Sequence, residues 1–225
     1  MNGMPETLQY ALIVIPCIVI AIVFHEVAHG WAALALGDPT AKEQRRLTLN
    51  PIRHVDPVGT VVVPGILALA GAPVFGWAKP VPVNAARLRN PRPGMMAVAA
   101  AGPATNFVLA LVGAAALGIV SAGGEPAELL TQGLFSFILI NLFIGTFNLL
   151  PIPPFDGSHI VEGVLPRRWA AAYEKLRPYG MLVFLALIAV AWAFPAFDII
   201  QRLIGPPVEW ALGRYLAFAA LFTGG

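Results

Sequence analysis

Long apolar runs with almost no charged residues constrain the fold of this chain more than any other feature of its sequence. Residues 8–36 form the longest run, in which Glu26 is the only Asp, Glu, Lys or Arg. About 20 apolar residues in a helix cross the ~30 Å hydrocarbon core of a lipid bilayer. Charged residues make up only 12% of the 225 residues, whereas a soluble domain has about 25%. These features exclude an ordinary soluble domain and predict an all-α polytopic membrane protein.

Five to six helical segments are expected, counting both those that cross the membrane and those that enter it and return. They cover residues 8–36, 58–75, 95–120, 131–150, 179–194 and 199–222. The second segment is short and interrupted by Pro and Gly residues. The last contains Arg202, Glu209 and Arg214, so it fits a helix lying at the membrane interface as well as a span.

Basic residues gather in three of the loops between these segments. Residues 37–57, 76–94 and 151–178 each contain four Lys or Arg, whereas residues 121–130 contain only two acids. By the positive-inside rule, the three basic loops lie in the cytoplasm. Because the first two of these loops are consecutive, we expect residues 58–75 to enter the membrane and return to the same side.

One cluster of ionisable residues lies inside the first apolar run. His25, Glu26 and His29 form the pattern HExxH. On a helix, the two histidines lie one turn apart on one face and can bind the same Zn²⁺, with Glu26 beside them to accept a proton from a water molecule that the metal activates. The alternative is a hydrogen-bonded cluster of neutral side chains. Because ionisable residues are costly inside a membrane, the cluster indicates a functional site.

A catalytic zinc usually has three protein ligands, so two histidines leave it one short. The candidates for the third ligand are His54, Asp56, Asp156, His159 and Glu162. Asp156 is best placed, because residues 131–150 run in the same direction as the first span and deliver it to the same depth. Three prolines before Asp156 prevent a continued helix and favour an extended segment. An ordinary turn at this position is the alternative, and His159 is the second choice of ligand.

Three motifs in this order resemble the site-2 protease family of intramembrane zinc metalloproteases. They are HExxH at 25–29, Gly-Pro-Ala-Thr-Asn at 102–106, and Asn-Leu-Leu-Pro at 148–151 leading to Asp156-Gly157, and the resemblance covers residues 20–165. It implies that His25, His29 and Asp156 hold one Zn²⁺ per chain. It also implies that Glu26 is the catalytic base and that Asn148 lies near the bound substrate.

Two loop segments, 50–57 and 76–84, resemble the compact prokaryotic branch of this family, which has no PDZ or CBS domains. The resemblance implies a single integral-membrane metalloprotease domain over 1–225, with a catalytic core at 8–165 and C-terminal helices at 179–222. We expect a multi-pass protein of the inner membrane whose active site lies towards the cytoplasmic side.

A small extended or β segment is expected near residues 76–84, where prolines alternate with other residues. Lys79, Val81 and Val83 keep their N–H groups on one edge, while the intervening prolines remove donors from the other. Such a segment can pair with a substrate strand on one side by strand addition. A Pro-rich surface loop is the alternative.

The expected reaction is hydrolysis of a peptide bond in or near a transmembrane segment of another membrane protein. The expected partners are the lipid bilayer and a substrate whose helix unwinds locally; the net charge of +2 gives no indication of nucleic-acid binding. A metal-binding but non-proteolytic membrane protein, such as a zinc carrier or an inactive relative, is the alternative. A third interpretation is a zinc protease that takes its third ligand from Glu162. The oligomeric state is not indicated.

His54, His159 and Asn106 are second-tier candidates for the site. Asn106 and Asn141 are expected to form hydrogen bonds between helices. His54 is expected to serve loop structure, with an approach to the metal as the alternative.

Overall fold

The structure, a computed structural model, describes residues 6–71, 76–124, 126–194 and 199–224, and within these ranges it is helical without any strand. The main helices are α1 (Glu6–Ala35), α4 (Pro91–Ala122), α5 (Glu128–Asn148), α8 (Gly180–Ala193) and α9 (Ile199–Ala220). Shorter helices are α2 (Thr40–Glu43), α3 (Val63–Leu69), α6 (Asp156–Val164) and α7 (Arg167–Glu174). The predicted all-α class is confirmed.

Four segments in the described part of the chain are long and apolar enough to cross a membrane. They are Leu8–Ala35, Pro91–Ala122, Glu128–Asn148 and Arg167–Ala193. All four overlap predicted spans, and the last includes α7 as well as α8. The mixed C-terminal segment forms α9, which is not among the four. The protein is therefore a multi-pass membrane protein.

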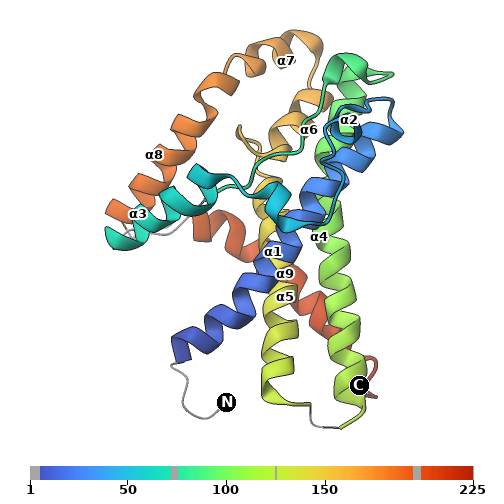
Figure 1. Cartoon of the computed structure of the whole chain (residues 1–225), viewed down its shortest axis with the longest axis vertical. Helices are drawn as coiled ribbons and strands as arrows, with labels where there is room; N and C mark the ends of the chain where they lie inside the picture. Colours follow the sequence, from blue (N-terminus) through green and yellow to red (C-terminus); the bar gives the residue numbers. More distant parts are fainter. Residues whose placement is uncertain (1–5, 72–75, 125, 195–198, 225) are drawn as a thin grey trace.

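The predicted basic loops share one end of the molecule. Figure 1 shows α2, α7 and the beginning of α4 at this end, and the connection from α4 to α5 at the opposite end, with the beginning of α1. This arrangement agrees with the direction that the loop charges assign to each span. We call the end that contains α2, α7 and the beginning of α4 the basic end.

The short apolar segment after the first basic loop returns to the basic end. A π-helical turn (Pro57–Val62) and α3 together make a helix about 20 Å long, too short for the hydrocarbon core. Beyond it, the N–H of Lys79 donates to the carbonyl of His54 at 2.8 Å. The N–H of Arg89 likewise donates to the carbonyl of Leu36 at 3.0 Å. The described residues on the two sides of this segment thus lie close together, as a return to the same side requires. Residues 72–75 lie outside the described part, and entry of the segment into the membrane stays a prediction.

Residues 76–84, which we call the covering segment, lie across α1 in an extended, irregular conformation. They form neither a helix nor a strand, so the predicted β character is absent there. The N–H of Trp77 donates to the carbonyl of Gly59 at 3.1 Å, and the N–H of Asn84 donates to Oδ2 of Asp38 at 2.6 Å. These bonds attach the segment to the π-helical turn and to the loop that follows α1.

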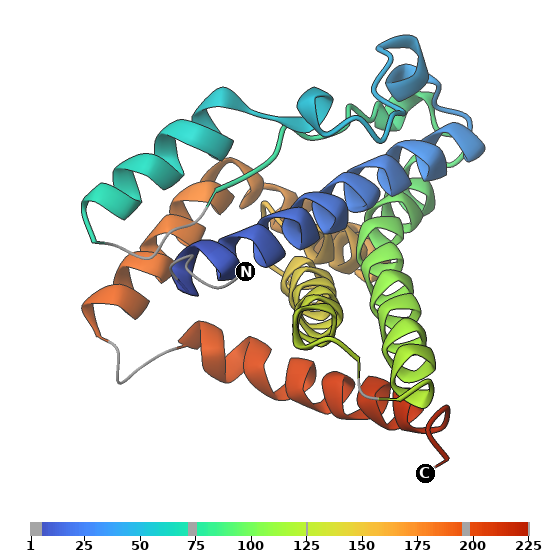
Figure 2. The same cartoon turned by 60° about the horizontal axis from the view of Figure 1, so that its bottom comes forward.

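The core forms where α4 and α5 pack against each other, with α1 and α9 beside them. Figure 2 shows α5 nearly end-on, surrounded by α1, α4 and α9. Ala110 and Ala114 on α4 and Ile138 and Leu142 on α5 are fully buried. Small residues on α4 allow close approach of its neighbours. This packing places the middle of α4 against the half of α1 that contains the HExxH pattern.

Candidate metal centre

His25 and His29 lie one turn apart on α1 and face α4. Both residues are buried, with exposed fractions of 5% and 9%. Asp156, the first residue of α6, approaches them from the other side. It can do so because α5 ends at Asn148 and the proline-containing residues 151–155 form turns and bends instead of continuing the helix.

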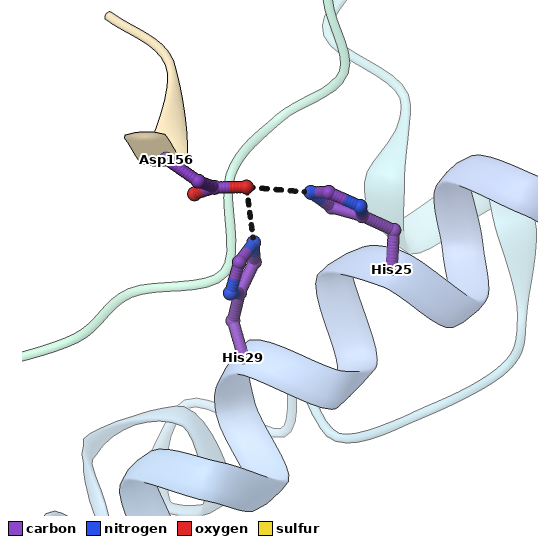
Figure 3. A group of neighbouring side chains, drawn as sticks. All are labelled: His25, His29 and Asp156. Atoms are coloured by element: carbon purple, nitrogen blue, oxygen red, sulfur yellow. Dashed lines mark ion pairs between the residues drawn. The ribbon is translucent and has the colours of Figure 1, made fainter. Parts of the chain in front are cut away.

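The three side chains converge on one point. Oδ2 of Asp156 lies 3.1 Å from Nε2 of His25 and 3.4 Å from Nε2 of His29. One potential ligand atom from each residue lies within 4.8 Å of the other two. Figure 3 shows both rings directed at the same carboxylate oxygen. Among the described residues, this is the one group of three or more His, Cys, Asp or Glu side chains with such spacing.

The hydrogen bonds around the site indicate that these atoms act as acceptors. Nδ1 of His29 lies 2.7 Å from the carbonyl oxygen of Val98; because a carbonyl only accepts, Nδ1 must donate. In the neutral ring, Nε2 then presents a lone pair to Asp156. Oδ2 of Asp156 is buried and has no hydrogen-bond partner in the described structure. A proton or a metal ion must supply positive charge here, and two imidazoles with a carboxylate suit Zn²⁺.

Gly102 on α4 leaves the space beside the two rings open. A Cβ atom at this position would lie 2.5 Å from Nε2 of His29 and 2.6 Å from Nε2 of His25. Any larger residue would therefore occupy space next to both nitrogen atoms. The absence of a side chain here fits a site that accommodates an ion.

Glu26 points to the covering segment. Its Oε2 accepts a hydrogen bond of 2.8 Å from the backbone N–H of Val81, and the Val81 side chain is buried close to Gly30, one turn further along α1. Sequence analysis missed this bond, because residues 26 and 81 come together only through the return of the chain to the basic end.

The predicted substrate edge of the covering segment is partly engaged within the chain. The N–H of Lys79 bonds to His54, that of Val81 bonds to Glu26, and the Val83 side chain packs against residues of α1 and α4. Pairing with a substrate strand would require exchange of the first two bonds. The role of these three residues in substrate binding stays a prediction.

Two other predicted site residues, Asn106 and Asn148, form different hydrogen bonds. Nδ1 of His25 lies 2.6 Å from Oδ1 of Asn106, so Asn106 contacts the site directly. Asn148 donates from Nδ2 to the carbonyl of Ile144 at 3.0 Å, which satisfies a carbonyl in the last turn of α5.

His54 and His159 are not part of the converging group. Nε2 of His54 lies 2.8 Å from the carbonyl of Thr48, so this residue stabilises its own loop. His159 lies 2.7 Å from the guanidinium of Arg177. Burial, followed by the charge of Arg177, lowers the pKa of His159.

Comparisons with known proteins agree with this site. The model of the family described as peptidase family M50 matches residues 117–191. A protein of Bacillus subtilis (strain 168), "Putative zinc metalloprotease YwhC", is 41% identical over 193 residues, which cover 82% of this chain and 85% of that protein. "Putative zinc metalloprotease Rip2" of Mycolicibacterium smegmatis is 28% identical over 179 residues, or 79% of this chain and 66% of that protein. No solved structure matches.

The similarity to the Bacillus protein extends over most of both chains, well beyond the residues that the family model matches. The chain belongs to peptidase family M50, the site-2 protease family of zinc metalloproteases.

Proposed function

We propose that this protein is an intramembrane zinc metalloprotease that hydrolyses peptide bonds in or near transmembrane segments of other membrane proteins. The observation that carries the proposal is the convergence of His25, His29 and Asp156, three acceptors from two helices, beside the acid Glu26. One Zn²⁺ per chain is held by these three ligands. Family membership supports the same chemistry.

The bound metal and Glu26 have separate roles in the proposed reaction. A bound zinc supplies a Lewis acid that polarises the scissile carbonyl and activates water. Glu26 accepts the proton of the attacking water and passes it to the leaving amine. The N–H of Val81, 2.8 Å from Oε2 of Glu26, limits the positions that this carboxylate can adopt.

The depth of the site supports cleavage within the membrane near the cytoplasmic side. His29 lies six residues before the end of α1 at Ala35, a distance of about 9 Å along the helix. The loop that follows is basic, as cytoplasmic loops are. A substrate helix must unwind before attack, because its peptide bonds are otherwise enclosed in the helical hydrogen-bond pattern. The partners are thus the bilayer and a membrane protein with a locally unwound segment, and the inner membrane is the proposed location.

The test combines zinc content with cleavage of model transmembrane substrates by purified protein. Glu26→Gln keeps an acceptor for the Val81 N–H and should retain zinc but lose cleavage. Asp156→Ala should lose zinc, while Glu43→Gln, at an exposed ion pair with Arg87, should behave as wild type. Wild-type protein that binds zinc but cleaves no substrate, with Glu26→Gln unchanged in every measurement, would instead identify a non-proteolytic zinc protein.

A further inference from the structure

Two fully buried asparagines connect α5 to the metal centre. Asn141 on α5 and Asn106 on α4 both have an exposed fraction of 0%. Nδ2 of Asn106 donates to Oδ1 of Asn141 at 2.9 Å. Oδ1 of Asn106 in turn lies 2.6 Å from Nδ1 of His25 on α1. One continuous chain of hydrogen bonds therefore crosses three helices, although α5 supplies no metal ligand.

The direction of this chain is fixed at its far end. Nδ2 of Asn141 donates to the backbone carbonyl of Phe137 at 2.8 Å. A backbone carbonyl only accepts hydrogen bonds, so the nitrogen of the Asn141 amide must face Phe137. Its oxygen therefore faces Asn106 and accepts.

The orientation of Asn106 follows from two acceptors. Its Nδ2 donates both to Oδ1 of Asn141 at 2.9 Å and to the backbone carbonyl of Ala21 at 3.1 Å. A rotation of this amide by 180° would place its oxygen against two other oxygens and break both bonds. Oδ1 of Asn106 must then face His25, so Nδ1 of His25 is the donor, and in the neutral ring Nε2 carries the lone pair.

The two histidines thus adopt the same tautomer, with the proton on Nδ1, but their hydrogen-bond acceptors differ. His29 donates to the backbone carbonyl of Val98, and a carbonyl group has no donor that it could present instead. His25 donates to a side-chain amide, whose oxygen and nitrogen ends are nearly equal in size. Only the further contacts of that amide prevent it from presenting its nitrogen to His25.

We propose that Asn106 and Asn141 are positioning residues that hold His25 in the tautomer with a proton on Nδ1, so that Nε2 can bind zinc. The inference rests on the proposed zinc site. Asn141 acts through Asn106, and α5 thereby takes part in forming a metal centre between α1 and α6.

The test measures two properties of the purified, full-length protein. The first is zinc affinity, by competition with a chelator. The second is the protonation of the His25 ring nitrogens, by ¹⁵N NMR of zinc-free protein labelled at histidine and held at a pH at which the ring is neutral. Asn106→Leu should weaken zinc binding about 10- to 100-fold, the usual effect of removing the partner of a ligating histidine. Asn141→Leu should weaken it several-fold, and both variants should populate the tautomer with a proton on Nε2.

Three controls separate positioning from packing. Leu142→Ala, at a fully buried neighbour on α5, should lower the thermal stability without changing zinc affinity or the His25 tautomer. Asn106→Asp should keep Nδ1 of His25 protonated, because a carboxylate has only acceptor atoms. In the Asn106→Leu background, Asn141→Leu should cause no further loss of zinc affinity.

Unchanged zinc affinity and an unchanged His25 tautomer in a folded Asn141→Leu variant would overturn the inference and leave the proposed function intact. A wild-type protein that binds no zinc while folded would overturn the proposed function itself. Equal losses of zinc affinity in Asn141→Leu and Leu142→Ala would assign the effect to packing and likewise contradict the inference.

Discussion

Replacement of Gly102 by alanine should abolish zinc binding without altering any ligand. The added Cβ would lie 2.5 Å from Nε2 of His29 and 2.6 Å from Nε2 of His25, whereas ordinary contacts begin at about 3.4 Å. Each ring would therefore have to retreat by about 0.8 to 0.9 Å. Zinc–ligand distances tolerate only about ±0.2 Å around 2.0–2.1 Å, so the two nitrogens can no longer share one ion with Asp156. Overpacking of this kind costs about 1–3 kcal/mol of folding stability, partly offset by the higher helix propensity of alanine, about 0.5–1 kcal/mol.

The assay is a zinc titration in detergent, with thermal unfolding of the zinc-free protein measured in parallel. We expect Gly102→Ala to fold, with a change in stability of no more than about 2 kcal/mol, and to bind no zinc at concentrations that saturate the wild type. Gly133→Ala is the matched control, because it also lies inside a helix and its Cβ meets no atom within 4 Å. Wild-type zinc affinity in Gly102→Ala would show that the space beside the two rings is not used by the ion.

Three further changes test the surroundings of the site. Gly157→Ala places a Cβ 2.2 Å from the backbone oxygen of Leu149, so thermal unfolding should show a loss of about 3 kcal/mol or more together with loss of zinc; normal stability would contradict the close approach. Val81→Pro removes the N–H that bonds to Glu26 and should lower kcat about 10- to 100-fold with zinc retained, whereas a rise in KM alone would favour a role in substrate pairing. Burial opposes ionisation of Asp38, but hydrogen bonds from two backbone N–H groups and a hydroxyl outweigh it and lower its pKa below 3.8. Its contribution to stability is therefore complete above that value and lost as the pH falls through the lowered pKa, so the melting temperature of Asp38→Asn should depend less on pH in acid than that of the wild type.

The sequence predicted the parts of the site that depend on local spacing. The HExxH pattern places two imidazoles on one helical face at any position in a helix, and the prolines after α5 predict a break before Asp156. The spans were predictable because apolar length is a property of the segment itself. Loop charge led to the prediction that residues 58–75 return to the same side, because it reports the side of the membrane on which a loop lies and not the path between two loops.

The contacts that surround the ligands were not predictable in the same way. Gly102, Asn106 and Val81 reach the site only through the packing of α4 and the covering segment on α1. Nothing in the spacing of residues 26 and 81 indicates that a backbone N–H meets a carboxylate there. For Asn148, the resemblance implied a position near the substrate. Its side chain donates to a carbonyl in its own helix, and its role towards substrate stays a prediction.

The position of Asp156 at the start of α6 has a mechanical consequence. An ion bound by both His29 and Asp156 connects two residues that are separated by α4 and α5 in the sequence. A cross-link that closes so long a segment strongly lowers the conformational entropy of the unfolded state. Removal of zinc by a chelator should therefore destabilise the region where α1 meets α6, while the packing between α4 and α5 stays intact. Deuterium uptake after zinc removal would then rise first at the basic end and last at Ile138 and Leu142.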